Sequence, residues 1–179
     1  MIPLKDHERI LMNDQVEKEV QAGMVEEITN PADIQYVSNV FFKKESTKMR
    51  RIINYIFLNK QTVHVEYDLP NLEELKSKLA GKKYLLGLDV KNAYGQVEIE
   101  EEYRKYFVFV IPGRVEGQKR YFRPIRMGFG SQSAPGFYSF ISNKVFEGVE
   151  NAFTYLDDIN SATNDFDEGL QTFKELCTR

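Results

Sequence analysis

Tryptophan is absent from this 179-residue sequence, and cysteine and histidine are scarce. The single cysteine, Cys177, excludes an intramolecular disulfide and a zinc site built on cysteines. The two histidines, His7 and His64, are too few for a histidine metal cluster. No apolar run approaches the ~18 residues of a membrane span, and the first ten residues are too polar for a secretory signal. These absences predict a soluble, intracellular domain without a membrane partner.

The sequence also lacks a large excess of one charge. It has 24 Lys and Arg residues and 27 Asp and Glu residues, which gives a net charge of −3. Taken as a sum, this balance disfavours a protein that coats nucleic acid by bulk charge. The distribution is uneven, however. Residues 43–60 carry six cations and one anion, Glu45. The six cations are Lys43, Lys44, Lys48, Arg50, Arg51 and Lys60. The local excess therefore leaves nucleic acid open as a ligand.

Three stretches show the spacing of amphipathic helices. Residues 7–24 place Met12, Val16, Val20 and Met24 on one face, and Gly23 provides a stop signal. Residues 72–79 follow Pro70, and Asn71 with Glu74 resembles a capping box. Residues 134–146 tolerate Pro135 in their first turn. Their apolar face comprises Phe137, Phe140, Ile141 and Val145. A fourth helix, which runs to the end of the chain, is marked by Phe166, Leu170, Phe173 and Cys177.

Strand signals lie between these helices. Residues 37–44 and 49–53 form a probable hairpin around the polar loop 45–48, and residues 106–111 and 119–125 form a second around Pro112-Gly113. Residues 84–88 form an apolar run typical of a strand buried on both faces. Residues 152–156 and 159–162 form a third hairpin with Asp157-Asp158 as its two-residue loop. The mixture of helices and antiparallel hairpins predicts an α+β fold.

Carboxylates stand out at two of these strands. Asp89 ends the apolar strand, and Asp157 with Asp158 occupies the loop of the third hairpin. Adjacent carboxylates beside a buried sheet repel one another, and a divalent cation relieves this repulsion. If the strands are neighbours, the three acids converge on a site for Mg²⁺, which prefers oxygen ligands. Two metals about 3.5–4 Å apart would suit displacement at phosphorus. The simpler interpretation is that Asp89 is a strand-end residue and the pair is a turn.

At these residues the sequence resembles the reverse transcriptases of retroviruses and of gypsy-type LTR retrotransposons. Residues 155–158, Tyr-Leu-Asp-Asp, match the family's Tyr-x-Asp-Asp (YXDD) box. Residues 88–94 match its Leu-Asp-x-x-x-x-Tyr segment, and residues 126–135 resemble its Met-Pro-Phe-Gly-x-x-x-Ala-Pro segment. Residues 39–62 resemble the fingers hairpin, and residues 7–26 resemble the entry helix. The blocks follow the family order over roughly residues 3–175.

The resemblance implies an α+β right-hand polymerase in which fingers and palm are present and the thumb is absent. The fingers would comprise about residues 1–62 and 97–131, and the palm about residues 63–96 and 132–179. The implied activity is RNA-directed DNA synthesis from dNTPs on an RNA or DNA template-primer. The implied partners are the remaining polyprotein regions (thumb, ribonuclease H and integrase), and the implied location is the cytoplasm, within the retroelement particle, or the nucleus.

The resemblance also assigns the site. Asp89 and Asp157 would bind two Mg²⁺ ions, which Mn²⁺ could replace, together with the backbone carbonyl of Val90, and Asp158 would be essential. Lys43 and Arg50 would hold the β- and γ-phosphates, as a guanidinium and an ammonium do well. The backbone N–H groups of Asn92 and Ala93 would face the triphosphate. Tyr94 would block a 2′-OH. Phe129, with Gly130, would pack on the incoming nucleotide, although a core position is the simpler interpretation of this phenylalanine.

The sequence departs from the family pattern at several positions. Asn54 stands where the family has Asp, and Ile56 where it has Arg, so that this ion pair is missing and less rigid fingers are expected. Gly128 and Ser131 replace a Pro and a Leu or Trp, and Tyr138 replaces Thr or Phe. These departures, with the missing thumb, leave open an inactive or domesticated remnant that binds nucleic acid without turnover. An unrelated Mg²⁺ phosphohydrolase using the same acids is a third hypothesis.

Overall fold

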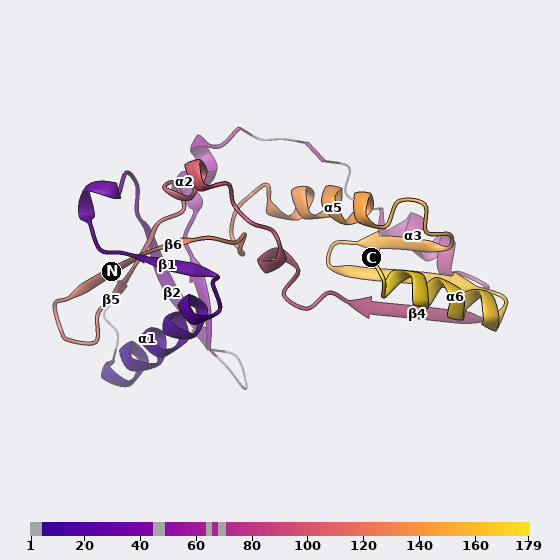
Figure 1. Ribbon diagram of the computed structural model, residues 1–179, viewed down its shortest axis with the longest axis horizontal. Helices are drawn as coiled ribbons and strands as arrows, with labels where there is room; N and C mark the ends of the chain where they lie inside the picture. The colour runs from indigo at the N-terminus through magenta and orange to yellow at the C-terminus, as the bar shows by residue number, and fades with distance from the viewer. Residues whose placement is uncertain (1–4, 45–48, 64–65, 68–70) are drawn as a thin grey trace. The chain divides into compact units, whose positions relative to one another are not determined.

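The computed structural model describes residues 5–44, 49–63, 66–67 and 71–179, and it divides the chain into two compact units. Unit 1 comprises Met1–Val63 and Tyr94–Gln132, and unit 2 comprises His64–Ala93 and Ser133–Arg179. Each unit is therefore assembled from two separate stretches of the chain, and each combines a sheet with helices (Figure 1). The predicted α+β class is confirmed at this level.

Unit 1 is built on a five-stranded sheet with the order β1-β6-β5-β2-β3. Its strands are β1 (Val25–Ile28), β2 (Ser38–Lys44), β3 (Met49–Ile53), β5 (Phe109–Pro112) and β6 (Lys119–Pro124). The two predicted hairpins are present as the antiparallel pairs β2–β3 and β5–β6. The strand of the second hairpin starts at Phe109, three residues later than expected. The sequence patterns predicted neither β1 nor the parallel pairing of β2 with β5.

Helix α1 (Asp6–Gln21) covers this sheet through the predicted apolar face. Met12 and Val16 are fully buried against Phe109, Ile111 and Phe122. The helix ends before Gly23, whose φ of +67° lies in the left-handed region that glycine adopts without strain. Short helices complete the unit: α2 (Ile56–Gln61), α4 (Glu101–Arg104) and the 3₁₀ turn η1 (Pro31–Asp33).

Polar groups tie α1 to the sheet. Arg120 on β6 donates to both carboxylate oxygens of Glu27 at 2.7 and 2.6 Å, to Glu17 at 2.7 Å and to Asn13 Oδ1 at 3.0 Å. Asn13 is fully buried and donates in turn to the carbonyl of Pro112 at 3.0 Å. Hydrogen bonding to Arg120 lowers the pKa of Glu27. The network satisfies a buried amide that would otherwise be costly to desolvate.

Unit 2 is built on a three-stranded antiparallel sheet with the order β4-β8-β7. Its strands are β4 (Tyr84–Asp89), β7 (Ala152–Tyr155) and β8 (Asp158–Thr163). Helix α6 (Phe166–Leu176) lies along β8 and β4, whereas α5 (Ala134–Val145) contacts β7 (Figure 1). A small core forms where Ile159, Leu176 and Val149 meet Leu86 and Leu88. The 3₁₀ turn η2 (Ala93–Gln96) begins at the last residue of the unit's first stretch.

Helix α3 (Leu72–Leu79) has the bounds expected from the sequence. The Asn71 side chain accepts from Glu73 N at 2.9 Å, so the predicted N-cap is present. Glu74 pairs instead with Lys78 at 2.7 Å. Pro70 and the loop 45–48 lie outside the described residues.

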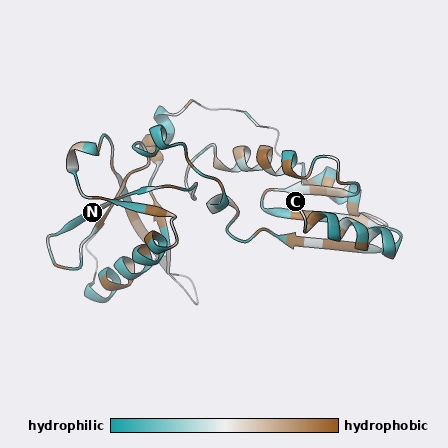
Figure 2. Ribbon diagram, viewed as in Figure 1, coloured by the Kyte–Doolittle hydropathy of each residue, from teal (hydrophilic) through white to brown (hydrophobic). Residues whose placement is uncertain are grey.

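Three predicted burial patterns in unit 2 are wrong. Strand β4 is not buried on both faces, because it is the outer strand of the sheet and Leu85 is 63% exposed. On α5, the apolar face with Phe137 and Phe140 is exposed, and the residues that face inward are Ala134, Tyr138, Ser139 and Ser142. On α6, Phe166, Leu170, Phe173 and Cys177 are exposed, and Thr172 and Leu176 are buried. Unit 2 therefore presents apolar surface along one strand and two helices (Figure 2).

Among the residues that the structure describes, no helix has the length and apolar character needed to cross a membrane.

Candidate catalytic site

The acidic hairpin of unit 2 turns one residue earlier than predicted. Strand β7 ends at Tyr155 and β8 begins at Asp158, so the two-residue loop is Leu156-Asp157 rather than Asp157-Asp158. Tyr155 and Asp158 are cross-strand partners that close the loop. Asp158 is therefore held by the sheet, whereas Asp157 lies in the turn.

Leu156 adopts a φ of +55°, in the left-handed region. Two-residue hairpin loops require positive φ at their first central position and usually place Gly, Asn or Asp there. A leucine in this conformation carries about 1–2 kcal/mol of steric strain. Strained backbone is retained where the surrounding structure determines it and is frequent at functional sites.

Asp89 lies directly opposite Asp158 in the register of β4 and β8. A further backbone hydrogen bond, from Val90 N to the carbonyl of Asp157 at 3.1 Å, joins the end of β4 to the turn. The condition for a shared site, that the strands bearing Asp89 and the acidic pair be neighbours, is thus met. Backbone pairing alone brings these acids to one end of the sheet.

Helix α5 supports this end of the sheet from the side of β7. The Thr154 hydroxyl donates to Asn143 Oδ1, and Thr154 is two residues before Leu156. Thr154 is buried and pairs in register with Ile159 of the core. This bond fixes the strand that leads into the turn.

The electrostatics at the hairpin favour a cation. Asp89 and Asp158 are exposed and Asp157 is half-buried. Within the described part of the chain, none of the three carboxylates forms an ion pair or accepts a side-chain hydrogen bond. Like charges directly opposite on a sheet are destabilising. Carboxylates and a carbonyl such as that of Val90 are the hard oxygen donors that Mg²⁺ prefers.

The side chains do not form a closed metal cage. In residues 5–44, 49–63, 66–67 and 71–179, no three Asp, Glu, His or Cys side chains are grouped so as to hold a metal ion. The position of the turn explains why the three acids are not grouped. Asp89 and Asp158 are cross-strand partners on adjacent strands, whereas Asp157 lies in the loop. The chemistry of the donors therefore fits a divalent cation, although the three side chains are not gathered around one point.

The predicted triphosphate-binding backbone directly follows β4. Asn92 has a φ of +53°, and Ala93 is buried at the start of η2. A left-handed residue in a tight turn directs successive N–H groups toward one side, a geometry that binds anions.

Tyr94 and Phe129, both in unit 1, lie in edge-to-face contact with their ring centroids 5.1 Å apart. Phe129 is 59% exposed, so the alternative that it is a core residue is wrong. The sequence had suggested each ring separately as a nucleotide contact and had not suggested that the two rings touch.

Asn59 on α2 is a supporting residue that the sequence interpretation missed. Its amide donates to the carbonyl of Gly130 at 2.9 Å, and its Oδ1 accepts from Gln132 N at 3.0 Å. Gly130 has a φ of +108°, and a Cβ there would lie 3.1 Å from the carbonyl oxygen of Ile53. Asn59 thus fixes the turn that follows Phe129. The sequence feature that could have identified Asn59 is its place in the block at residues 39–62, which resembles the fingers hairpin.

Lys43 and Arg50 are direct cross-strand partners in the β2–β3 hairpin. Near the end of that hairpin, Asn54 N donates to the carbonyl of Asn39 at 2.8 Å, and Asn54 Oδ1 accepts from Ile56 N at 3.1 Å. Asn54, which precedes the N-cap residue Tyr55, therefore binds the first backbone N–H of α2, a role that an aspartate could also fill. Ile56, which stands where the family pattern has Arg, is 65% exposed.

Comparisons with known proteins show the family of the chain. The sequence profile of a family described as "Reverse transcriptase (RNA-dependent DNA polymerase)" matches residues 42–179. The chain is 34% identical over 148 residues to an enzymatic polyprotein of Cestrum yellow leaf curling virus, a match that covers 81% of the chain and 22% of that polyprotein. It is 25% identical over 181 residues to the retrovirus-related Pol polyprotein from transposon 297 of Drosophila melanogaster, covering 99% of the chain and 16% of that protein. The chain thus spans about a fifth of the length of these relatives.

Proposed function

Because the chain belongs to the reverse transcriptase family, we propose that it forms the fingers and palm of an RNA-directed DNA polymerase, with unit 1 as the fingers and unit 2 as the palm. The observation that carries this proposal is the register of β4 with β8. It sets Asp89 opposite Asp158 and ties Val90 to Asp157, so that the acids of two motifs distant in sequence share one end of a sheet.

Asp89, Asp157 and Asp158, with the carbonyl of Val90, are the residues that would hold two Mg²⁺ ions. When bound, these ions would supply Lewis acidity toward the primer 3′-OH and neutralise charge on the departing pyrophosphate. The exposure of Asp89 and Asp158 leaves both carboxylates accessible to a ligand from solution.

The remaining residues would bind and orient the dNTP. Lys43 and Arg50 supply a cationic pair for the β- and γ-phosphates, and the N–H groups of Asn92 and Ala93 supply neutral donors for the triphosphate. Tyr94 would exclude a ribose 2′-OH. Its edge contact with Phe129 would restrict the ring's rotation and sharpen this exclusion.

The substrates would be a dNTP and the primer 3′-OH on an RNA or DNA template. The relatives are polyproteins several times longer than this chain. The thumb, ribonuclease H and integrase regions are therefore proposed as partners within one polyprotein.

The test is primer extension with Mg²⁺ by the protein, both alone and within its full reading frame. Asp157→Asn is expected to lower incorporation at least ~100-fold, since it removes charge from the metal-binding set. Asp167→Asn, on the exposed first turn of α6, is the matched control and should leave incorporation unchanged. Extension that survives Asp157→Asn would refute the role given to this residue.

A second candidate function is nucleic-acid binding without synthesis, as expected of a domesticated remnant. It is favoured by the exposed Ile56 and by side chains that are not gathered into a metal cage. The same proteins decide between the two, because a remnant would bind primer-template equally with and without Mg²⁺ and would incorporate no nucleotide.

A further inference from the structure

The turn that carries Asp157 is strained, so neighbouring contacts must hold it in place. Leu156 has a φ of +55°, and a side chain in this region persists only where the surrounding structure determines the backbone. From β4, the backbone bond of Val90 N to the carbonyl of Asp157 at 3.1 Å ties the turn. From α5, a hydrogen bond reaches Thr154 of β7, three residues before Asp157. The position of Asp157 therefore depends on contacts from two elements, β4 and α5.

Thr154 is a buried polar residue beside the core of unit 2. It is 7% exposed, and its cross-strand partner on β8 is the core residue Ile159. A buried hydroxyl is costly unless it has a hydrogen-bond partner. The Thr154 hydroxyl has this partner in Asn143 Oδ1. One side-chain hydrogen bond therefore links the strand that leads into the turn to helix α5.

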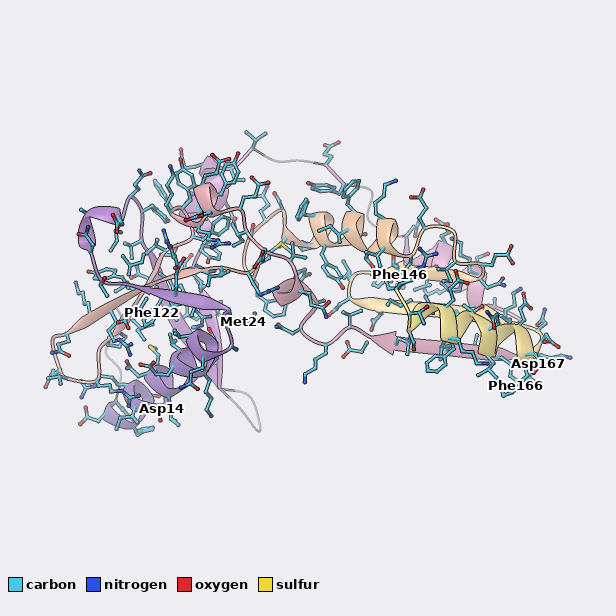
Figure 3. All side chains as sticks on the ribbon, viewed as in Figure 1. Asp14, Met24, Phe122, Phe146, Phe166 and Asp167 are labelled. Carbon is cyan, nitrogen blue, oxygen red and sulfur yellow. The ribbon has the colours of Figure 1, made fainter. Side chains whose placement is uncertain are left out.

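Asn143 is placed by the helix that bears it. It lies three residues before Phe146, the C-cap residue of α5, which packs against the core of unit 2 (Figure 3). Three of the four buried residues of α5 are small, namely Ala134, Ser139 and Ser142. A small side chain makes few van der Waals contacts, so these residues specify the position of α5 along β7 only weakly. The directional hydrogen bond from Thr154 to Asn143 supplies this specificity.

We propose that Asn143 is a positioning residue for Asp157. It acts through Thr154, because the hydrogen bond fixes β7 against α5 and β7 leads into the turn in which Asp157 lies. The consequence for metal binding rests on the proposed function, in which Asp157 is one of the residues that would hold Mg²⁺. Asn143 itself touches neither metal nor substrate. Residues that orient a metal ligand in this way tune affinity without contacting the ion.

The first test follows the turn itself and needs no metal. The Val90 amide reports the turn, because it donates to the carbonyl of Asp157. Thr154→Val removes the hydroxyl and keeps the branched shape, so it should lower the hydrogen-exchange protection factor of this amide at least ~5-fold relative to the other amides of β4 and β8. Thr154→Ser keeps the hydroxyl and should preserve protection. An equal loss at every amide of unit 2 would show a merely structural role and overturn the proposal.

The second test asks whether Asn143 and Thr154 act as one unit. Asn143→Ala should lower the protection of the Val90 amide as much as Thr154→Val does, and the double variant should be no worse than either single variant, since each removes the same bond. Lys144→Gln is the matched control, because Lys144 is the next residue of α5 and pairs with Glu147 at 3.1 Å. This control should leave the Val90 amide unchanged. Additive losses in the double variant would contradict the proposal.

The third test connects the turn to the metal. Mn²⁺ serves as the probe of the Mg²⁺ site, and its binding is measured by the loss of the electron paramagnetic resonance signal of the free ion. Asn143→Ala and Thr154→Val should each raise the Mn²⁺ dissociation constant about 10-fold, and the Mg²⁺ concentration for half-maximal nucleotide incorporation by a similar factor. Thr154→Ser and Lys144→Gln should change neither quantity.

The outcomes separate this proposal from the proposed function. If the Val90 amide loses protection in Asn143→Ala while Mn²⁺ affinity is unchanged, the turn moves without consequence for the metal and the proposal fails. If the unchanged protein binds Mn²⁺ but incorporates no nucleotide, and both variants still bind Mn²⁺ more weakly, the polymerase function fails while the positioning role of Asn143 stands.

Discussion

Leu156 is a single residue that strains the backbone of the turn carrying Asp157. Its positive φ is required by the two-residue loop, yet its side chain disfavours that conformation. Glycine would accept the same φ without strain, whereas a β-branched residue would accept it least. The strain is therefore a property of the side chain and can be changed without moving the turn.

We expect Leu156→Val to lower the free energy of unfolding by about 1–2 kcal/mol, and Leu156→Gly to leave it unchanged or raise it by up to about 1 kcal/mol. Urea denaturation of both variants measures the difference. The reverse order of stability would show that the turn is held by packing of the leucine rather than strained by it.

Gly136 on α5 is a second position where one added atom, a Cβ, should change the stability of the fold. A Cβ there would lie 2.6–2.9 Å from the Cβ and ring atoms of Tyr67, which packs beside Phe137 and Phe140. Alanine normally stabilises a helix by about 1 kcal/mol over glycine. At this position the overlap should reverse that gain.

Gly136→Ala is expected to destabilise the protein by about 1–3 kcal/mol in thermal or urea unfolding. Gly128→Ala, where a Cβ meets nothing within 4 Å, is the control and should be neutral. In a Tyr67→Gly background both the Cβ and the ring that cause the overlap are gone, so adding Gly136→Ala should then cost nothing. Additive effects of the two changes would contradict the contact.

At the scale of elements, the pairing of β1 with β6 depends on pH. The pKa of Glu27 is lowered by its bidentate bond to Arg120, so the pair stabilises unit 1 fully above the ordinary glutamate value of 4.5. As the pH falls through the lowered pKa of the folded state, Glu27 becomes protonated and this contribution is lost.

The protection factors of the β1 and β6 amides, which are corrected for the slower intrinsic exchange in acid, should therefore fall on acidification. In Glu27→Gln this acid-induced fall should be smaller, because the titrating group is gone. Glu26→Gln is a useful comparison, since Glu26 pairs with Arg123 at 2.6 Å on the same two strands. An unchanged acid response in Glu27→Gln would assign the effect to other carboxylates.

The elements also show what a sequence can predict. Periodicity placed Met12 and Val16 on one face of α1, and the short polar loops predicted the three hairpins, because these signals are local. The same periodicity grouped Phe166, Leu170 and Phe173, but it could not predict that this face is exposed, since burial depends on what covers a face. The parallel pairing of β2 with β5 joins segments about 70 residues apart and had no local signal.

The site was predictable to a similar extent. The sequence marked Asp89 and the acidic pair as the ends of strands and left open whether those strands are neighbours, which the register of β4 with β8 shows them to be. The position of the turn was one residue off, because an apolar Leu156 gives no turn signal. The family assignment removes the hypothesis of an unrelated phosphohydrolase.

The two units are interleaved along the chain, and this has a consequence for biosynthesis. Strands β1 and β2 of unit 1 must wait for β5 and β6, and the intervening residues 64–93 already belong to unit 2. Emerging from the ribosome, the chain therefore exposes unpaired strand edges until about residue 132 has been made. Such late closure of long loops slows folding and favours chaperone contact. Because each unit consists of two separate stretches, cleavage of one peptide bond cannot release either unit whole. The two units are therefore expected to be synthesised, folded and conserved together.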